Sequence, residues 1–191
     1  KGPRVSEKAP TTIDEELLKL SVNELILKLA ENKNEAVIAR LVEIGQPTVE
    51  PLTEALKDKS YTLRASAATT LGKIKDHNSI DPLIALLKDK TLSVKRSAAL
   101  ALGEIGNPRA IDPLITALKL KSNHKTMGPN ITTALGEIGQ PAVELLIALL
   151  HDEKIDLRSL AATALIKIGK PAIEPLILLL NNESDDIRAL A

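Results

Sequence analysis

A short motif recurs along this sequence about every 30 residues, and this periodicity limits the chain to a narrow set of folds. Its clearest copy is Leu102-Gly103-Glu104-Ile105-Gly106-Asn107-Pro108. The isoleucine of the motif marks the register and recurs at Ile44, Ile74, Ile105, Ile138 and Ile168. The intervals are 30, 31, 33 and 30 residues. A period of this length is typical of a solenoid, in which each repeat packs only against its neighbours.

Each repeat contains two helical patterns. The first places apolar residues at i, i+3, i+4 and i+7, as at Ile80, Leu83, Ile84 and Leu87, with a proline in the first turn of most copies. The second carries alanine pairs, which let a neighbouring helix approach closely. The glycine after the isoleucine is typical of the left-handed residue that ends a helix. These patterns predict an all-α protein, an α-α superhelix with about five two-helix repeats and a terminal half repeat.

The bounds of the solenoid and of its repeats follow from the same register. Residues 1–11 are predicted to form a flexible arm or linker, and residues 12–191 a single solenoid. Thr12-Ile13-Asp14-Glu15 and Ser21-Val22-Asn23-Glu24 match the capping box that begins a helix. Because the chain starts without Met and stops inside an expected helix, we expect a piece of a longer protein. The predicted repeats lie near residues 22–45, 46–75, 76–106, 107–139, 140–169 and 170–191, the last incomplete.

Composition argues against several classes of function. Of 191 residues, 25 are basic and 25 acidic, and 1% are aromatic. Nucleic-acid binding needs clustered cations or stacking aromatics, so no nucleic-acid partner is expected. No apolar run is long enough to span a membrane, so no membrane partner is expected. The absence of cysteine is compatible with a reducing compartment, and we expect a cytoplasmic protein.

The pattern L-G-E-I-G-N-P-R-A-I-D-P-L-I-x-A-L-K, followed by V-K/R-x-x-A-A-x-A-L-G, resembles the HEAT-like repeats of the phycobilisome-lyase type, found in archaea and bacteria. The resemblance covers roughly residues 34–191. It implies an α-α superhelix whose second helices line a concave surface, which in this family commonly binds other proteins. It therefore favours a non-catalytic scaffold for a protein or peptide. The alternative, by analogy alone, is an accessory or cofactor-handling subunit of a lyase-like enzyme.

Aligned repeats place a set of side chains on the outward side of the second helices. The middle of this surface is small, hydroxylated or apolar, and its charges lie at the edges, which favours contact with a polypeptide. Leu100 and Leu160 are the expected apolar anchors. The predicted partner-binding residues are Ser66, Thr69, Arg96, Ser97, Leu100, Asn130, Thr133, Leu160 and Thr163.

An aspartate lies six residues before a basic residue at the turn within three of the repeats, and Asn182 with Arg188 is a weaker version of the pair. The recurrence of the pair favours a structural ladder along one edge over an anion site. In the resembling family an Asp and an Arg at this turn also serve structure. The ladder is predicted to comprise Asp58, Arg64, Asp89, Lys95, Asp152, Arg158 and Arg188.

One repeat is longer than the others. Its extra residues fall within 119–130, where Leu120 takes the aspartate position and Gly128 the basic position. Pro129 is expected to start a shortened second helix. The longer loop is either a tolerated insertion or a partner contact through His124, Lys125 and Met127.

No residue set predicts catalysis, a cofactor or a metal. The serines, threonines and glutamates fall at repeated or capping positions, and His77, His124 and His151 are too few for a zinc site. A metal-dependent enzyme of the deoxyhypusine hydroxylase kind would need repeated His-Glu pairs, and only His151-Asp152 comes close. The apolar segment 175–180 is expected to be covered by self-association or by further sequence.

Overall fold

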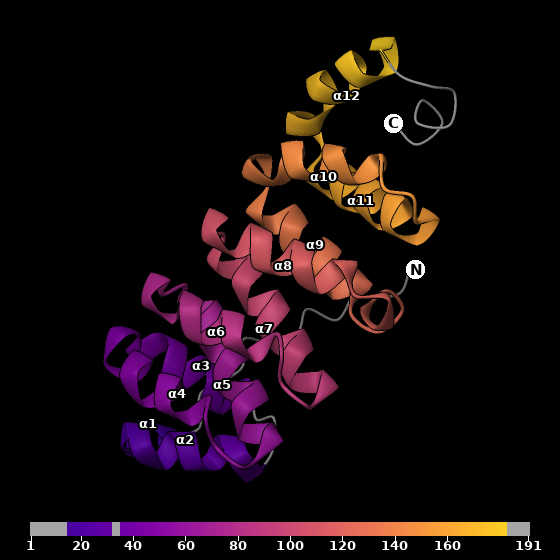
Figure 1. Cartoon of the computed structure of the whole chain (residues 1–191). Coiled ribbons are helices and arrows are strands. Elements are labelled where there is room, and N and C mark those ends of the chain that lie inside the picture. Colours follow the sequence, from indigo (N-terminus) through magenta and orange to yellow (C-terminus); the bar gives the residue numbers. More distant parts are fainter. Residues whose placement is uncertain (1–14, 32–34, 183–191) are drawn as a thin grey trace, which may run out of the picture.

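The computed structural model describes residues 15–31 and 35–182. These residues form twelve α-helices and no strand (Figure 1). Three of the sequence predictions fall outside the described residues. They concern the arm at residues 1–11, residues 12–14 of the first capping box, and Arg188. The helices are α1 Glu15–Leu18, α2 Val22–Glu31, α3 Glu35–Ile44, α4 Val49–Ala55, α5 Tyr61–Ile74, α6 Ile80–Leu86, α7 Leu92–Ile105, α8 Ile111–Lys119, α9 Gly128–Ile138, α10 Val143–Leu150, α11 Ile155–Ile168 and α12 Lys170–Asn182.

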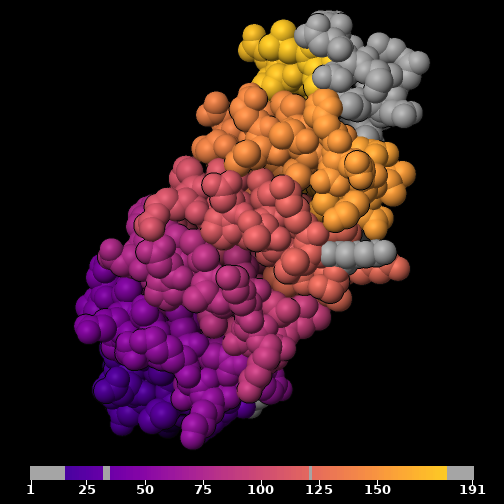
Figure 2. Space-filling view, in the orientation of Figure 1, coloured from indigo at the N-terminus to yellow at the C-terminus, as the bar shows by residue number. Residues whose placement is uncertain are grey.

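The helices stack in two layers, as the α-α superhelix predicted from the sequence requires. The second helices of successive repeats, α5, α7, α9 and α11, pack side by side in one layer. The first helices, α4, α6, α8 and α10, form the other layer and make few contacts with one another. Figure 2 shows the repeats as successive bands along the molecule. Because the second helices are closer together than the first, the stack curves and its inner side is the second-helix layer.

Glycines allow this close approach. A Cβ atom placed on Gly72 would lie 2.6 Å from the Cα of Ala101, and one on Gly103 would lie 2.5 Å from the Cα of Ala134. No side chain fits at these distances, so helix packing requires glycine at positions 72 and 103. The alanines opposite complete the contact, as the alanine pattern predicted.

The turns between repeats confirm the helix-stop signals. Each predicted helix end has a residue with positive φ: Gly45, Lys75, Gly106, Gly139 and Gly169. Lys75 adopts φ 59° and ψ 35°, so this position is left-handed despite its side chain. Short 3-10 turns follow at Gln46–Thr48, His77–Ser79, Pro108–Ala110 and Gln140–Ala142.

The amino-terminal repeat is irregular, as expected for the end of a solenoid. The capping box at its start is present, because the Ser21 amide donates to Glu24 Oε2 at 2.8 Å and the Glu24 amide donates to Ser21 Oγ at 3.4 Å. Helix α2 then packs against both α4 and α5. It thus covers the first regular repeat from one end.

The close contact at Gly103 predicts the sign of the stability change when this glycine is replaced by alanine. Helix propensity alone would make Gly103→Ala stabilising by about 1 kcal/mol. Because the new methyl group would strike the backbone of α9, we expect instead a loss of about 1–3 kcal/mol. Urea unfolding followed by circular dichroism measures the difference. Gly128→Ala is the control, because its Cβ would meet only the flexible end of Leu160; a stabilised Gly103→Ala protein would contradict the packing account.

Candidate functional site

The exposed strip of the second helices is the candidate binding surface, here called the inner face. Of the predicted residues, Arg96 and Thr163 are exposed and Lys125 is exposed in the insert. The half-buried members are Thr69, Ser97, Leu100, Asn130, Thr133 and Leu160. These half-buried and exposed side chains from α5, α7, α9 and α11 define the inner face.

Ser66 is not part of this surface, so its assignment as a binding residue is wrong. Its exposure is 1%. All residues from 63 to 68 of α5 are buried, a run longer than one helical turn. Helices α2, α4 and α7 all contact α5. Column alignment could not show this, because it treats every second helix as equally exposed.

Hydroxyl groups form the middle of the inner face. The hydroxyls of Thr69, Thr133 and Thr163 donate to the carbonyl oxygens four residues earlier, at 3.0, 2.9 and 2.8 Å. Thr69 Oγ1 also lies 3.3 Å from Ser97 Oγ, which joins α5 to α7. Since the hydroxyl hydrogens are used within the helices, the outward lone pairs remain as acceptors. The face therefore presents neutral hydrogen-bond acceptors.

Two glutamates border the inner face at the carboxyl ends of the helices. Glu104 lies over Gly72 and Glu137 lies over Gly103. The Oε2 atom of Glu104 is buried and accepts no hydrogen bond from the described part of the chain. Burial raises the pKa of Glu104, and the nearby Lys73 and Lys75 oppose this only in part. Burial and the Glu104 charge likewise raise the pKa of Glu137.

The insert is folded into the structure rather than extended from it. Met127 is fully buried and His124 is 8% exposed, so of the three residues of the possible loop contact the structure leaves Lys125 exposed. The Asn123 amide group donates to the Ala117 carbonyl at 2.8 Å, and Arg96 Nε donates to the Thr126 carbonyl at 2.9 Å. Met127 thus belongs to the hydrophobic core of the stack.

His124 has an unusual environment. Neither ring nitrogen makes a hydrogen bond with described residues, and Nδ1 lies 3.6 Å from Asp156 Oδ2.

The shortened helix that Pro129 was expected to start is present as α9, which begins at Gly128.

The turn residues pair between repeats as well as within them. Arg64 donates from Nη1 to the Asp58 carbonyl at 2.8 Å, and from Nε and Nη2 to the carboxylate of Asp89 in the next repeat at 2.8 and 3.0 Å. The Asp58 carboxylate instead accepts the Ser60 amide. Hydrogen bonds from Arg64 and Thr91 outweigh the effect of burial and lower the pKa of Asp89.

The other predicted ladder residues do not repeat the Arg64–Asp89 link. Arg158 donates to the Asp152 carbonyl at 3.1 Å, and the Asp152 carboxylate accepts the Lys154 amide. Lys95 has no aspartate at the corresponding position in the following repeat, because Leu120 stands there. A bidentate link between neighbouring repeats is therefore seen, within residues 35–182, at Arg64 and Asp89.

A second set of links between repeats was missed by sequence reasoning. Gln46 Nε2 donates to Asp76 Oδ1 at 3.1 Å, and Asn107 Nδ2 lies 3.1 Å from His77 Nδ1. Arg109 Nη2 donates to Asp81 at 2.9 Å. Their separations of 28 to 30 residues match the repeat period, and this spacing between polar turn residues could have indicated them.

The described residues contain neither a cluster of metal ligands nor a single helix that could span a membrane. In the described ranges, no three His, Asp or Glu side chains converge as they would around a metal ion. Across residues 15–31 and 35–182, no individual helix has the length and apolar character to cross a membrane, and only the pair Gly128–Ile138 and Gln140–Leu150, bent by 118°, passes on length and composition.

Known proteins share this architecture. The family of HEAT repeats matches residues 49–126 and 130–191. The complex of CpcE and CpcF of phycocyanin lyase from Nostoc sp. PCC7120 contains a chain with 22% identity and a TM-score of 0.57, aligned over 97% of this chain and 78% of that one. Human deoxyhypusine hydroxylase in complex with glycerol aligns at 22% identity over 87% and 70%, with a TM-score of 0.46. No curated protein sequence matches the chain.

The Arg64 link yields a pH-dependent prediction. Asp89→Asn removes the charge that the buried guanidinium faces, so we expect a loss of about 3 kcal/mol at neutral pH. The lowered pKa of Asp89 stabilises the fold above its ordinary value of 3.8, and this contribution is lost as pH falls through the lowered value. The difference between variant and wild type in urea unfolding should therefore shrink in acid. Asp58→Asn is the control, since its carboxylate faces no guanidinium; an equal loss in both variants would contradict the link.

The burial of Glu104 predicts the opposite dependence of stability on pH. Its raised pKa means that the folded state disfavours the carboxylate, so Glu104→Gln should be more stable than wild type at neutral pH. The gain should vanish below the ordinary value of 4.5, where the acid is protonated in both states. Thermal unfolding across this range measures it, with the exposed Glu144→Gln as control. A gain that is independent of pH would show that charge is not its cause.

Proposed function

The chain belongs to the HEAT-repeat family, and we propose that it is a non-catalytic scaffold that binds a protein or peptide along its inner face. The observation that carries the proposal is the uncharged hydroxyl strip of Thr69, Ser97, Thr133 and Thr163. Threonine and serine lose little side-chain entropy on binding, and neutral groups are less costly to desolvate than ions.

The inner face supplies complementary chemistry for a polypeptide. Its threonine lone pairs accept hydrogen bonds, so backbone or side-chain N–H groups of a partner fit them. Half-buried Leu100 provides an apolar contact beside the hydroxyls. Glu104 and Glu137 border the strip beside Lys73, Lys75 and Lys167, so this edge carries charges of both signs. The preferred partner is thus rich in hydrogen-bond donors.

Substitution of the strip tests this proposal. Thr133→Arg and Thr163→Arg together place two long cations on it without opening the core. Wild-type protein immobilised on beads should retain a polypeptide from native lysate, identified by mass spectrometry, and the double variant should bind it at least about tenfold more weakly.

A matched variant places the same side chain on the opposite layer. Ala148→Arg lies at an exposed position of the first helix α10, so partner binding should persist. Binding that survives the double variant and fails with Ala148→Arg would overturn the assignment to the inner face. Circular dichroism must show that all the variants are folded.

A further inference from the structure

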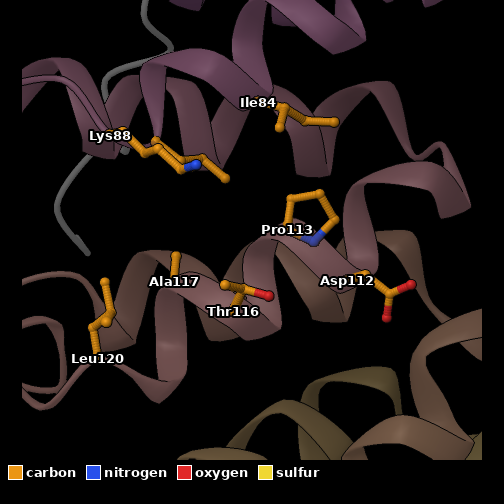
Figure 3. A pocket seen from close by; sticks show the side chains of 8 residues that line it. Ile84, Lys88, Asp112, Pro113, Thr116, Ala117 and Leu120 are labelled. Carbon is orange, nitrogen blue, oxygen red and sulfur yellow. The ribbon is translucent and has the colours of Figure 1, made fainter.

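A groove opens on the outer layer, on the side away from the inner face. It lies between the first helices α6 and α8 and has a volume of about 340 Å³. Figure 3 shows Ile84 and Lys88 on one wall and Pro113, Ala117 and Leu120 on the other. The splayed packing of the first helices leaves room there, since α6 and α8 make few contacts.

Two residues make this groove apolar and open. Ala117, like Ala55 of α4, is smaller than Leu86 of α6 and Leu149 of α10 at the same position, so no large side chain fills the groove there. Leu120 occupies the position of Asp89 and Asp152, and it is 56% exposed. Leu120 is also where the insert begins. The insert therefore reshapes the outer layer, although His124 and Met127 are buried.

The groove has an unpaired charge at each end. Lys88 lies near the Leu120 end and Asp112 near the other (Figure 3). Within the described residues neither makes an ion pair. Asp112 corresponds to Asp81, whose partner is Arg109, but Pro141 stands at the position of Arg109 in the next repeat. The apolar floor thus lies between a free ammonium group and a free carboxylate.

We propose that this groove binds an amphipathic helix of a partner protein, oriented antiparallel to α8. In that orientation the amino-terminal turn of the partner helix lies by Lys88 and its carboxyl-terminal turn by Asp112. Acidic residues are favoured in the first turn of a helix and basic residues in the last, so the partner's preferred charges meet their complements. Aliphatic residues at i, i+3 and i+4 of that helix enter the groove between Ile84, Ala117 and Leu120. This second site is independent of the inner face.

A synthetic helix tests the site directly. The probe has about 14 residues, cross-linked between turns because a free helix of that length is marginal in water. It carries glutamate in its first turn, leucines at the groove spacing and arginine in its last turn. Methyl NMR of the full chain should show saturable shifts at Ile84, Leu87 and Leu120. A probe with glutamate and arginine exchanged should bind at least about tenfold more weakly.

Variants borrowed from other repeats separate binding from folding. Ala117→Leu fills the groove and Leu120→Asp restores the repeat residue, so both should fold and weaken binding about tenfold or more. Lys88→Glu should weaken binding, whereas Lys119→Glu, the same position on α8 outside the groove, should not. Undiminished binding by Ala117→Leu, or shifts confined to the methyl groups of Leu100 and the inner face, would overturn this site and leave the inner-face proposal standing.

Discussion

The close contact between successive second helices is the constraint from which the rest of the architecture follows. Gly72 and Gly103 let α5, α7 and α9 approach until backbone meets alanine. The first helices have leucine, isoleucine and proline on their surfaces and stay further apart. Unequal spacing in the two layers bends the stack. The same difference in helix spacing leaves a narrow polar strip on the inner layer and room for a groove on the outer layer.

The glycine contact also explains the electrostatics of the inner face. Because Gly72 and Gly103 have no side chain, the glutamate side chain of the next helix lies directly against each glycine. Its carboxylate then loses water without gaining a donor, which raises the pKa of Glu104. Arg64 shows the opposite outcome, because its guanidinium donates to carbonyls of its own turn and to Asp89 of the next repeat. The buried charges of this stack are thus stabilised at one edge and destabilised at the other.

Periodicity predicted what depends on local spacing. The helix positions, the positive φ at Gly106 and Lys75, and the short helix after Pro129 all follow from residues close together in sequence. The pairing of Arg64 with Asp89 did not, because a six-residue spacing suggested a partner within the repeat. Burial of Ser66 and Met127 was also missed. Both depend on which neighbouring helices cover a position, and a repeat alignment averages that information away.

Departures from the repeat deserve more weight than the repeat itself when a binding site is sought in such a chain. Positions shared by all repeats serve the contacts between repeats, and so they cannot distinguish one solenoid from another. Leu120 lacks the carboxylate that Asp89 and Asp152 have at the same position, and its exposed side chain lines the groove between α6 and α8. Ala117 leaves the groove open, and Asp112 at its end has no arginine across the next turn, because Pro141 stands there. The leucine at position 120 thus replaces a polar turn residue with apolar surface, which is the change that the proposed partner helix requires of this groove.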